Sequence, residues 1–381
     1  MLSMMASLSF AQLVNDGATI TIKNGATLFV ESDVTNNGAG TIAVEGTGIL
    51  EVQGHLTNNA TLTTQSGSKV KFSGAANSNF KSNGASISNL EISKTGSTVT
   101  LTDVASVSGN LDFGSAGSSK LLLGNNNLVL GSAATATGHD ADEYVVTAGT
   151  GVVQKNLADA VYTNQPFTFP VGDASNYTPL ETSFSGTTVG GNLKSKVNNV
   201  VHPSKPASAE SFIARYWDID ATGFTGYSNT LIGTYASGDA NGTPSLIKGA
   251  VYDATSWSYA AAATNGTSTV TGSTDDAVAD FTGTNFYGKV NFRAILSASY
   301  NTATNEMNTL LNAPTGTNWL ETSALTSPYN AAPFNAQPAS VSAGFFLANP
   351  DIVDWVMLEL RDPAAPTVAT TNSASAFIIK D

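Results

Sequence analysis

A repeat near the N-terminus constrains the fold of this chain more than any other feature. The segment from Leu28 to Asn37 recurs as Leu50 to Asn59, and the matching positions are Leu28 with Leu50, Val30 with Val52, Val34 with Leu56, and the two closing asparagines. Hydrophobic and polar residues alternate in each copy, and a pair of asparagines closes it. Short alternating strands with a period of about 20 residues are typical of a solenoid in which each coil stacks on the previous one. We expect the asparagine pairs at one corner of successive coils, where amides tolerate left-handed backbone and bond along the stack.

The strand-and-turn pattern runs from residue 13 to residue 179 and predicts a right-handed parallel β-helix of about five coils, closed by a cap. After Gly74 the repeat is no longer legible, which either coils of mixed length or a flattening of the helix would explain. Aromatic residues with Pro166 and Pro170 favour a cap over the last sheet edge, because proline cannot donate to a strand ladder.

The rest of the chain also predicts β-structure. Strands lengthen and aromatic residues appear over 180–299, which favours an antiparallel β-sandwich with Trp217 and Trp257 in its core. A further C-terminal β module is expected over 300–381. Its last strand is either truncated or an edge that another chain completes. The residues expected to take part in such an assembly are Phe377, Ile378 and Ile379. The predicted fold class is therefore all-β.

Composition limits the partners. Charged residues make up 12% of the 381 residues and hydrophobic residues 41%, which is typical of a folded chain. A net charge of −13 disfavours nucleic acid and anionic lipid. The chain has no cysteine, which excludes disulfides, thiolate nucleophiles and zinc–thiolate sites. Residues 1–12 read as the remnant of a secretory signal peptide, or alternatively as a buried first strand or a helical cap. No stretch approaches the length of a transmembrane helix.

Residues with catalytic chemistry are scattered. The three histidines lie on different predicted units, namely His55, His139 and His202. No nucleophile elbow, zinc-protease, phosphate-loop or dinucleotide motif occurs. The acidic candidates on the solenoid are Glu31, Asp33, Glu45 and Glu51. They do not form a ladder, because the copies of Glu31 and Asp33 one coil later are Gln53 and His55. We therefore expect no enzyme.

Two groups of residues suggest binding. The densest acidic cluster could supply oxygen ligands to calcium, although it lacks the spacing of a calcium loop, and its alternative is a solvated turn. Its candidate ligands are Asp140, Asp142 and Glu143. No other cofactor is expected. Tyrosines of the expected sandwich could form a platform that stacks on sugars. These are Tyr216, Tyr227, Tyr235, Tyr252 and Tyr259.

A likeness is carried by the N-terminal repeats and by four further segments, Tyr144 to Gly151, Phe169 to Gly172, Tyr177 to Pro179 and Ile352 to Asp362. These segments resemble the large secreted cell-surface and adhesin-like proteins of Bacteroidetes bacteria, which begin with parallel β-helix repeats. Such proteins are usually exported by a dedicated C-terminal signal and serve as surface, adhesive or matrix components. No C-terminal sorting domain is visible here, and the family's last module continues further, so the resemblance implies the N-terminal part of a longer protein.

The function expected from these observations is that of a non-enzymatic extracellular structural protein, exported to the cell surface or matrix. It would act as a stalk, an adhesin or a self-assembling subunit of a filament or layer. Its partners would be other copies of itself or other surface proteins. The alternatives are a glycan-binding surface module and, with less support, a β-helix enzyme that degrades polysaccharides.

Overall fold

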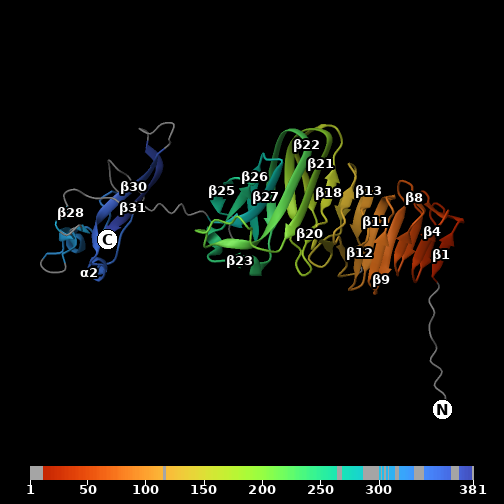
Figure 1. Cartoon of the computed structure of the whole chain (residues 1–381), viewed down its shortest axis with the longest axis horizontal. Coiled ribbons are helices and arrows are strands. Elements are labelled where there is room, and N and C mark those ends of the chain that lie inside the picture. The colour runs from red at the N-terminus through yellow and green to blue at the C-terminus, as the bar shows by residue number, and fades with distance from the viewer. Residues whose placement is uncertain are drawn as a thin grey trace, which may run out of the picture. The chain divides into compact units, whose positions relative to one another are not determined.

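The structure, a computed structural model, describes residues 12–114, 117–263, 268–285, 300–301, 303, 306–307, 309–313, 317–329, 339–361 and 369–379. It confirms the all-β class, with 56% strand and 6% helix. The chain divides into two compact units, Met1–Gly288 and Lys289–Asp381 (Figure 1). No helix in the described ranges is long and apolar enough to cross a membrane.

The first unit begins with a β-solenoid of about seven turns, rather than five. Every strand pair within it is parallel. One sheet contains β1 (Leu13–Asp16), β4 (Val34–Asn37), β7 (Leu56–Asn58), β10 (Ser78–Lys81), β12 (Thr98–Leu101), β14 (Lys120–Leu122), β17 (Tyr144–Val146) and β20 (Val171–Gly172). A second contains β3 (Thr27–Val30), β6 (Ile49–Val52), β9 (Lys69–Gly74), β11 (Ser86–Lys94), β13 (Ala105–Phe113), β15 (Leu128–Leu130) and β18 (Val153–Asn156), with β16 (Thr135–Thr137) beside β13. The third contains β2 (Thr19–Ile22), β5 (Thr41–Val44) and β8 (Thr61–Thr64).

The coils differ in length, which explains why the repeat fades. In the first sheet Val34 pairs with Leu56, and Leu56 pairs with Phe80 in the next coil, which is longer. The coil that pairs Val145 with Val171 is longer still. The third sheet ends at β8, and the following strands β11 and β13 are nine residues long. A repeat of constant length therefore describes only the first coils.

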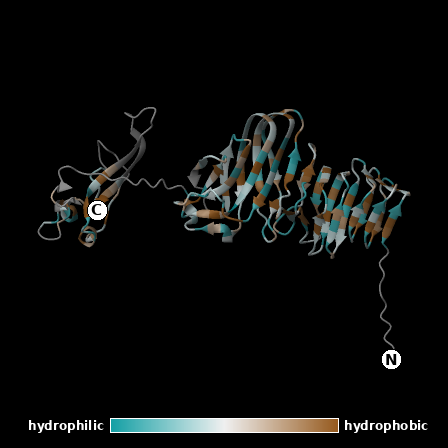
Figure 2. Ribbon diagram, viewed as in Figure 1, coloured by the Kyte–Doolittle hydropathy of each residue, from teal (hydrophilic) through white to brown (hydrophobic). Residues whose placement is uncertain are grey.

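Stacked hydrophobic side chains fill the solenoid. Figure 2 shows hydrophobic and hydrophilic residues alternating along its strands, as expected for strands that bury one face. Phe80 lies between Leu56 and Leu101 in the parallel ladder, and all three are at most 2% exposed. Fully burying a side chain of this size contributes about 1.5–3 kcal/mol, so each added coil extends one continuous core.

The solenoid continues directly into antiparallel strands. Strand β18 pairs in parallel with β15 and antiparallel with β21 (Leu180–Asn198). The same sheet then runs through β22 (Phe212–Thr234), β27 (Val278–Thr284), β24 (Lys248–Tyr252) and β25 (Trp257–Ala263). It has 16 strands in total (Figure 1). The separate β-sandwich expected over 180–299 is not confirmed, because these strands share their hydrogen-bonded sheet with the solenoid.

Strands β21 and β22 pair along most of their length, and different neighbours flank their two halves. Beside one half lie β19 (Val161–Phe169) and β26 (Thr269–Thr274). Gly233 faces the ring of Trp217 so closely that an added Cβ would lie 2.5 Å from a ring atom. Trp217 is fully buried, which confirms it as a core residue. Trp257 is only partly buried, so its predicted core position is wrong. The short elements here are η1 (Ser237–Asp239), β23 (Ala240–Asn241) and η2 (Pro244–Leu246).

The second unit has its own small core. Its elements are β28 (Tyr300–Asn301), β29 (Glu306–Met307), η3 (Leu310–Asn312), α1 (Trp319–Ser323), α2 (Phe345–Ala348), β30 (Ile352–Arg361) and β31 (Ala369–Ile379). Strands β30 and β31 form an antiparallel pair. Leu320, Phe346 and Trp355 are the buried centre of this core. Asn318 caps α1, since its side chain accepts a hydrogen bond from the backbone N–H of Glu321.

Candidate functional site: a hydroxyl-lined groove

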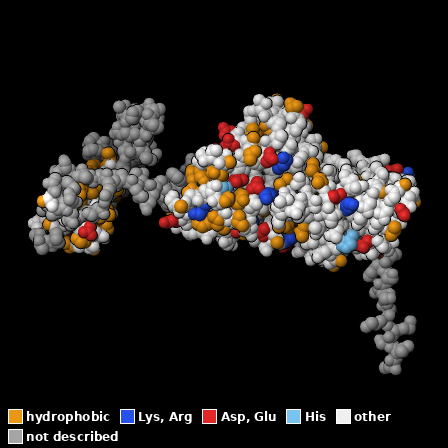
Figure 3. Space-filling view, viewed as in Figure 1, with side chains coloured by type: hydrophobic (Ala, Val, Ile, Leu, Met, Phe, Trp, Pro, Cys, Tyr) orange, Lys and Arg blue, Asp and Glu red, His pale blue; other side chains and the backbone are white. Residues whose placement is uncertain are grey.

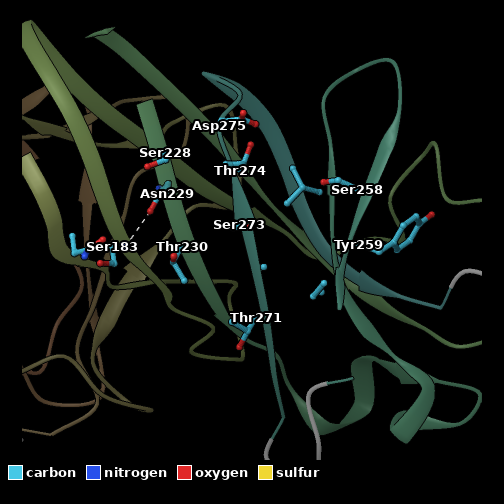
Figure 4. Close-up of a pocket in the computed structure, with 15 residues that line it drawn as sticks. Ser183, Ser228, Asn229, Thr230, Ser258, Tyr259, Thr271, Ser273, Thr274 and Asp275 are labelled. Atoms are coloured by element: carbon cyan, nitrogen blue, oxygen red, sulfur yellow. Dashed lines mark hydrogen bonds between the residues drawn. The ribbon is translucent and has the colours of Figure 1, made fainter. Parts of the chain in front are cut away.

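A groove of about 790 Å³ lies in the antiparallel part of the first unit. It is bordered by β22, β24, β25 and β26 and by single residues of β19 and β21 (Figure 4). Nine of its fifteen lining residues are serine, threonine or asparagine. Six of the hydroxyl-bearing residues are Ser183, Ser228, Thr230, Ser258, Thr271 and Ser273. We call these six the groove hydroxyls.

Strand register places some of these hydroxyls in a row. Ser183 on β21 pairs with Thr230 on β22, and Thr230 pairs with Ser273 on β26. Residues that are directly paired point to the same face of a sheet. The neighbours of Thr230 along the strand, Asn229 and Leu231, are buried, whereas Thr230 is exposed. Alternation along β22 thus presents the hydroxyl to solvent and the apolar side chain to the core.

The groove hydroxyls are not used to hold the fold together. None of these six hydroxyl groups makes a hydrogen bond to another residue in the described part of the chain. Hydroxyls of the solenoid commonly do so: Thr98 Oγ1 donates to Asn77 Oδ1 over 3.2 Å, and Thr137 Oγ1 to Asp112 Oδ1 over 2.7 Å. The groove therefore displays a set of donors and acceptors that the protein itself leaves available.

The floor of the groove is held in place. Asn229 Oδ1 accepts a hydrogen bond from the backbone N–H of Ser183 over 3.0 Å, as the dashed line in Figure 4 marks. Its Nδ2 donates to the hydroxyl of Tyr227 over 3.0 Å. Glycines bring backbones together there, since a Cβ on Gly249 would collide with the carbonyl oxygen of Thr271. The side chains that line the groove therefore belong to closely packed strands.

The groove is close to electrically neutral. Asp275 is the one ionisable carboxylate among the described lining residues, and no lysine or arginine is among them. Most of the surface visible in Figure 3 is likewise uncharged, in keeping with the low content of charged residues. The ring of Tyr259 points away from the cavity in Figure 4, so this residue lines the groove with its backbone and not with its ring.

Four of the five candidate tyrosines of the expected sugar platform separate into two groups, apart from Tyr259. Tyr227 and Tyr235 are buried in the core, and burial raises the pKa of Tyr227 to about 12. Tyr216 and Tyr252 instead meet at His202, whose ring lies 4.9 Å and 5.2 Å from theirs. Buried residues are unavailable to a ligand, so Tyr227 and Tyr235 cannot form part of a platform.

His202 fastens a loop to the sheet. It is 4% exposed, and its ring also packs edge-on against Trp257 at 4.9 Å. His202 Nε2 lies 2.9 Å from Asp280 Oδ2, and the backbone N–H of Ser204 donates to its Nδ1 over 3.1 Å. The indole N–H of Trp257 donates to the carbonyl of Ser204. This cluster of aromatic rings is therefore engaged by the chain's own loop, which sequence patterns do not reveal.

The predicted calcium residues form a hydrogen-bonded turn. Asp140 Oδ1 accepts from the backbone N–H groups of Asp142 and Glu143 over 2.8 Å and 3.1 Å. Glu143 is buried, accepts from Ser119 Oγ, and has a pKa raised by burial. Asp142 lines a small pocket together with Lys120, whose charge repels a cation. Within the described ranges, no three acidic, histidine or cysteine side chains group into a metal site.

The other two histidines are far from the groove. His55 Nδ1 accepts from the backbone N–H of Asn79 over 2.9 Å, which links two coils. His139 Nδ1 lies 2.7 Å from the hydroxyl of Tyr177, and burial lowers the pKa of this histidine. Each of these two histidines therefore links neighbouring segments of the chain through a ring nitrogen.

Three of the four acidic candidates on the solenoid make contacts across coils, two of them with lysines. Lys23 Nζ lies 2.9 Å from Glu45 Oε2, and Lys71 Nζ lies 3.6 Å from Glu51 Oε1. Asp33 Oδ1 accepts from the backbone N–H of His55 over 2.8 Å. These contacts stabilise the stack and leave no pair of free carboxylates among these three acidic residues for acid–base chemistry.

Sequence reasoning missed three buried cations. Arg215 donates to Asp239 over 2.7 Å and to Asp173 over 2.6 Å, and it is fully buried. Lys94 and Lys155 donate mainly to backbone carbonyls. A signal for all three exists in the sequence, because each occupies the buried phase of an alternating strand. The buried residues two positions away are Ile213 and Trp217 for Arg215, Ile92 for Lys94, and Val153 for Lys155.

The predicted assembly residues lie on β31. Its register pairs Ile378 with Asp354 and Phe377 with Trp355 of β30. The rings of Phe377 and Trp355 are 4.2 Å apart, so Phe377 belongs to the core of the second unit. Ile379 is 63% exposed. Within the described ranges this sheet has two strands, so the second edge of β31 has no strand beside it.

Comparisons with known proteins return no relative: no family model, no curated protein sequence and no solved structure matches this chain.

Proposed function

We propose that this chain is a non-enzymatic structural protein of the extracellular surface, acting as a stalk, an adhesin or a self-assembling subunit. The observation that supports this most is the continuity of one sheet from β3 to β25. A hydrogen-bonded wall that passes from stacked coils into antiparallel strands gives a stiff body, because no flexible linker interrupts it. Such a body can hold a binding surface or a partner away from an anchoring point.

The handedness of the solenoid and the partners of the chain belong to the same proposal. A right-handed helix follows the general preference of parallel strand connections. The resemblance to secreted surface proteins supports export, and the acidic composition supports solubility outside the cell. Candidate partners are further copies of this chain or other surface proteins, which would add a strand at the edge of β31 that no described strand covers.

The stiffness of the first unit is tested by hydrogen exchange on the full chain. We expect slow exchange to continue through the pairing of β18 with β21, because its backbone groups belong to one ladder. Rapid exchange confined to that junction would reveal a hinge and contradict the stalk.

Self-assembly is tested by negative-stain electron microscopy over a range of protein concentrations. We expect filaments or layers, and we expect Ile379→Lys to abolish them, because a charge at the open edge opposes strand addition. The matched control is Leu347→Lys, which changes another exposed residue of the second unit that is not on β31. Single particles at every concentration, or equal effects of both variants, would contradict assembly through β31.

Glycan binding is the second candidate function, and the hydroxyl-lined groove is the observation that favours it. The enzyme alternative lacks comparable support, because the solenoid carboxylates Glu45 and Glu51 are paired with lysines. An assay for released reducing or unsaturated sugars tests it directly.

A further inference from the structure

We infer that the groove between β22, β24, β25 and β26 binds an uncharged oligosaccharide, an inference that rests on the second candidate function and is independent of the structural role. The groove has the volume of an ordinary ligand site, about 790 Å³. Nine of the fifteen residues that line it are serine, threonine or asparagine, so it can hydrogen-bond a ligand at many points.

Hydrogen-bond chemistry selects this ligand class. A serine or threonine hydroxyl both donates and accepts, and it rotates to suit its partner. Sugar hydroxyls have the same dual character, so each groove hydroxyl can pair with one in either direction. In the row formed by Ser183, Thr230 and Ser273, neighbouring strands are about 4.8 Å apart, a spacing on the scale of one sugar ring. The six groove hydroxyls have no protein partner in the described ranges that a ligand would have to displace.

Charge excludes the main competing ligands. A phosphorylated, sulfated or uronate-containing chain needs basic side chains, and none lies in the described lining. The carboxylate of Asp275 and the net charge of −13 repel such chains further. A polycation would need several carboxylates, whereas the lining offers one. A neutral polyol is the class that matches both the hydroxyls and the charge.

The groove is also preorganised. Asn229 is held by Ser183 and Tyr227, and Gly249 lies against the backbone of Thr271. Side chains mounted on packed strands lose little further freedom when a ligand binds. The ring of Tyr259 points away from the groove, so the ligand is held by polar contacts.

The test is ligand-observed saturation-transfer NMR with the full chain and a panel of maltohexaose, cellohexaose and xylohexaose at millimolar concentration. We expect saturation transfer to at least one of them and none to polygalacturonate. The variant Thr230→Val/Thr271→Val/Ser273→Ala should weaken binding at least tenfold. The single variant Ser273→Ala, which leaves the rest of the groove intact, should weaken it by a smaller factor, so the test survives misfolding of the triple variant.

Two controls locate the site. Thr225→Val changes an exposed threonine on the same strand β22 outside the groove and should leave binding unchanged. Trp257→Ala removes a ring that stacks on the ring of Tyr259, which points away from the groove, and should also bind normally. Absence of transfer to every neutral probe, preference for polygalacturonate, unchanged binding by the triple variant, or loss of binding with either control variant would overturn the inference. Assembly without sugar binding would leave the structural role intact.

Discussion

The two buried lysines, Lys94 and Lys155, are held mainly by oxygen atoms of the backbone. Lys94 is fully buried, and its ammonium donates to the carbonyls of Gln53 and Ser73 over 2.8 Å and 2.6 Å. It also donates to Ser78 Oγ over 2.8 Å. An ammonium has three N–H donors, so Lys94 is fully satisfied without a carboxylate. One side chain thereby connects backbone from three coils.

Replacing Lys94 with methionine should lower the free energy of unfolding by about 1–3 kcal/mol, because buried acceptors lose their donor. Denaturant unfolding measures the change. Lys23→Met is the matched control, since Lys23 pairs with Glu45 at an exposed position and should cost less than about 0.5 kcal/mol. Equal effects of the two substitutions would contradict the role assigned to Lys94.

Alkaline pH should stabilise the fold through Lys94 and Lys155. Burial lowers the pKa of each to about 8, from the value of 10.5 expected in the unfolded chain. The unfolded state therefore binds more protons above pH 8, and the free energy of unfolding rises with pH, by at most about 1.4 kcal/mol per pH unit for each lysine. Measurements from pH 8 to 9 stay below about pH 10, where the tyrosines of the unfolded chain titrate. A slope that persists in Lys94→Met/Lys155→Met would refute this assignment.

Arg215 connects three segments at a buried position. It donates to Asp173, to Asp239 and, over 3.2 Å, to Thr178 Oγ1. Arg215→Met leaves two carboxylates without their partner and should cost about 3–5 kcal/mol in denaturant unfolding. Arg215→Lys restores the charge without the planar fork and should recover part of that loss. A cost below about 1 kcal/mol for Arg215→Met would contradict this account.

Successive coils of the solenoid are joined by a ladder of amides. Asn15 Nδ2 donates to Asn36 Oδ1 over 2.9 Å, and Asn36 Nδ2 donates to Asn58 Oδ1 over 2.8 Å. The expected bonding along the stack is therefore confirmed. The expected left-handed backbone is wrong for these asparagines, which lie in strands, and the left-handed residue of that turn is Gly38 with φ of 56°.

Breaking the ladder in its middle should uncouple two coils. Asn36→Ala removes two buried hydrogen bonds, one from Asn15 and one to Asn58, and each lost bond costs about 0.5–1.5 kcal/mol, because Asn15 still donates to the carbonyl of Ala18 and Asn58 still accepts from the N–H of Ala60. Asn37→Ala, one residue further on, removes only an exposed contact with Asn59 and should have little effect. Denaturant unfolding and hydrogen exchange of β4 and β7 compare the two. Equal stabilities would show that the ladder contributes nothing.

The whole molecule contains two separate cores among its described residues, one around Trp217 and the other around Trp355. Since the chain divides into two units, we expect two thermal transitions. Trp217→Ala and Trp355→Ala should each cost about 3–5 kcal/mol, and each should lower the midpoint of one transition while leaving the other in place. Calorimetry of the full chain measures both. A single transition shifted by either variant would contradict independent units.

Local pattern explains which features of this protein could be predicted. The repeat from Leu28 to Asn59 can be recognised because successive coils pair the same positions with one another. Its periodicity therefore predicts the solenoid and the all-β class. The pattern could not report that β18 pairs with β21, because the paired residues, such as Val153 and Ser195, are distant in the chain and leave no periodic trace. The expected sandwich boundary at residue 180 falls within this shared sheet.

Composition and neighbours along the chain are enough to predict the solenoid, the alternation of buried and exposed positions and the absence of cysteine chemistry. Contacts across strands could be learned only from the folded chain. Folding joined Ser183, Thr230 and Ser273 into one row, placed His202 among three aromatic rings and buried Lys94 among carbonyls. The physical reason is that these groups acquire their roles from partners distant in the chain, which only the folding of the coils and of the long strands β21 and β22 brings together.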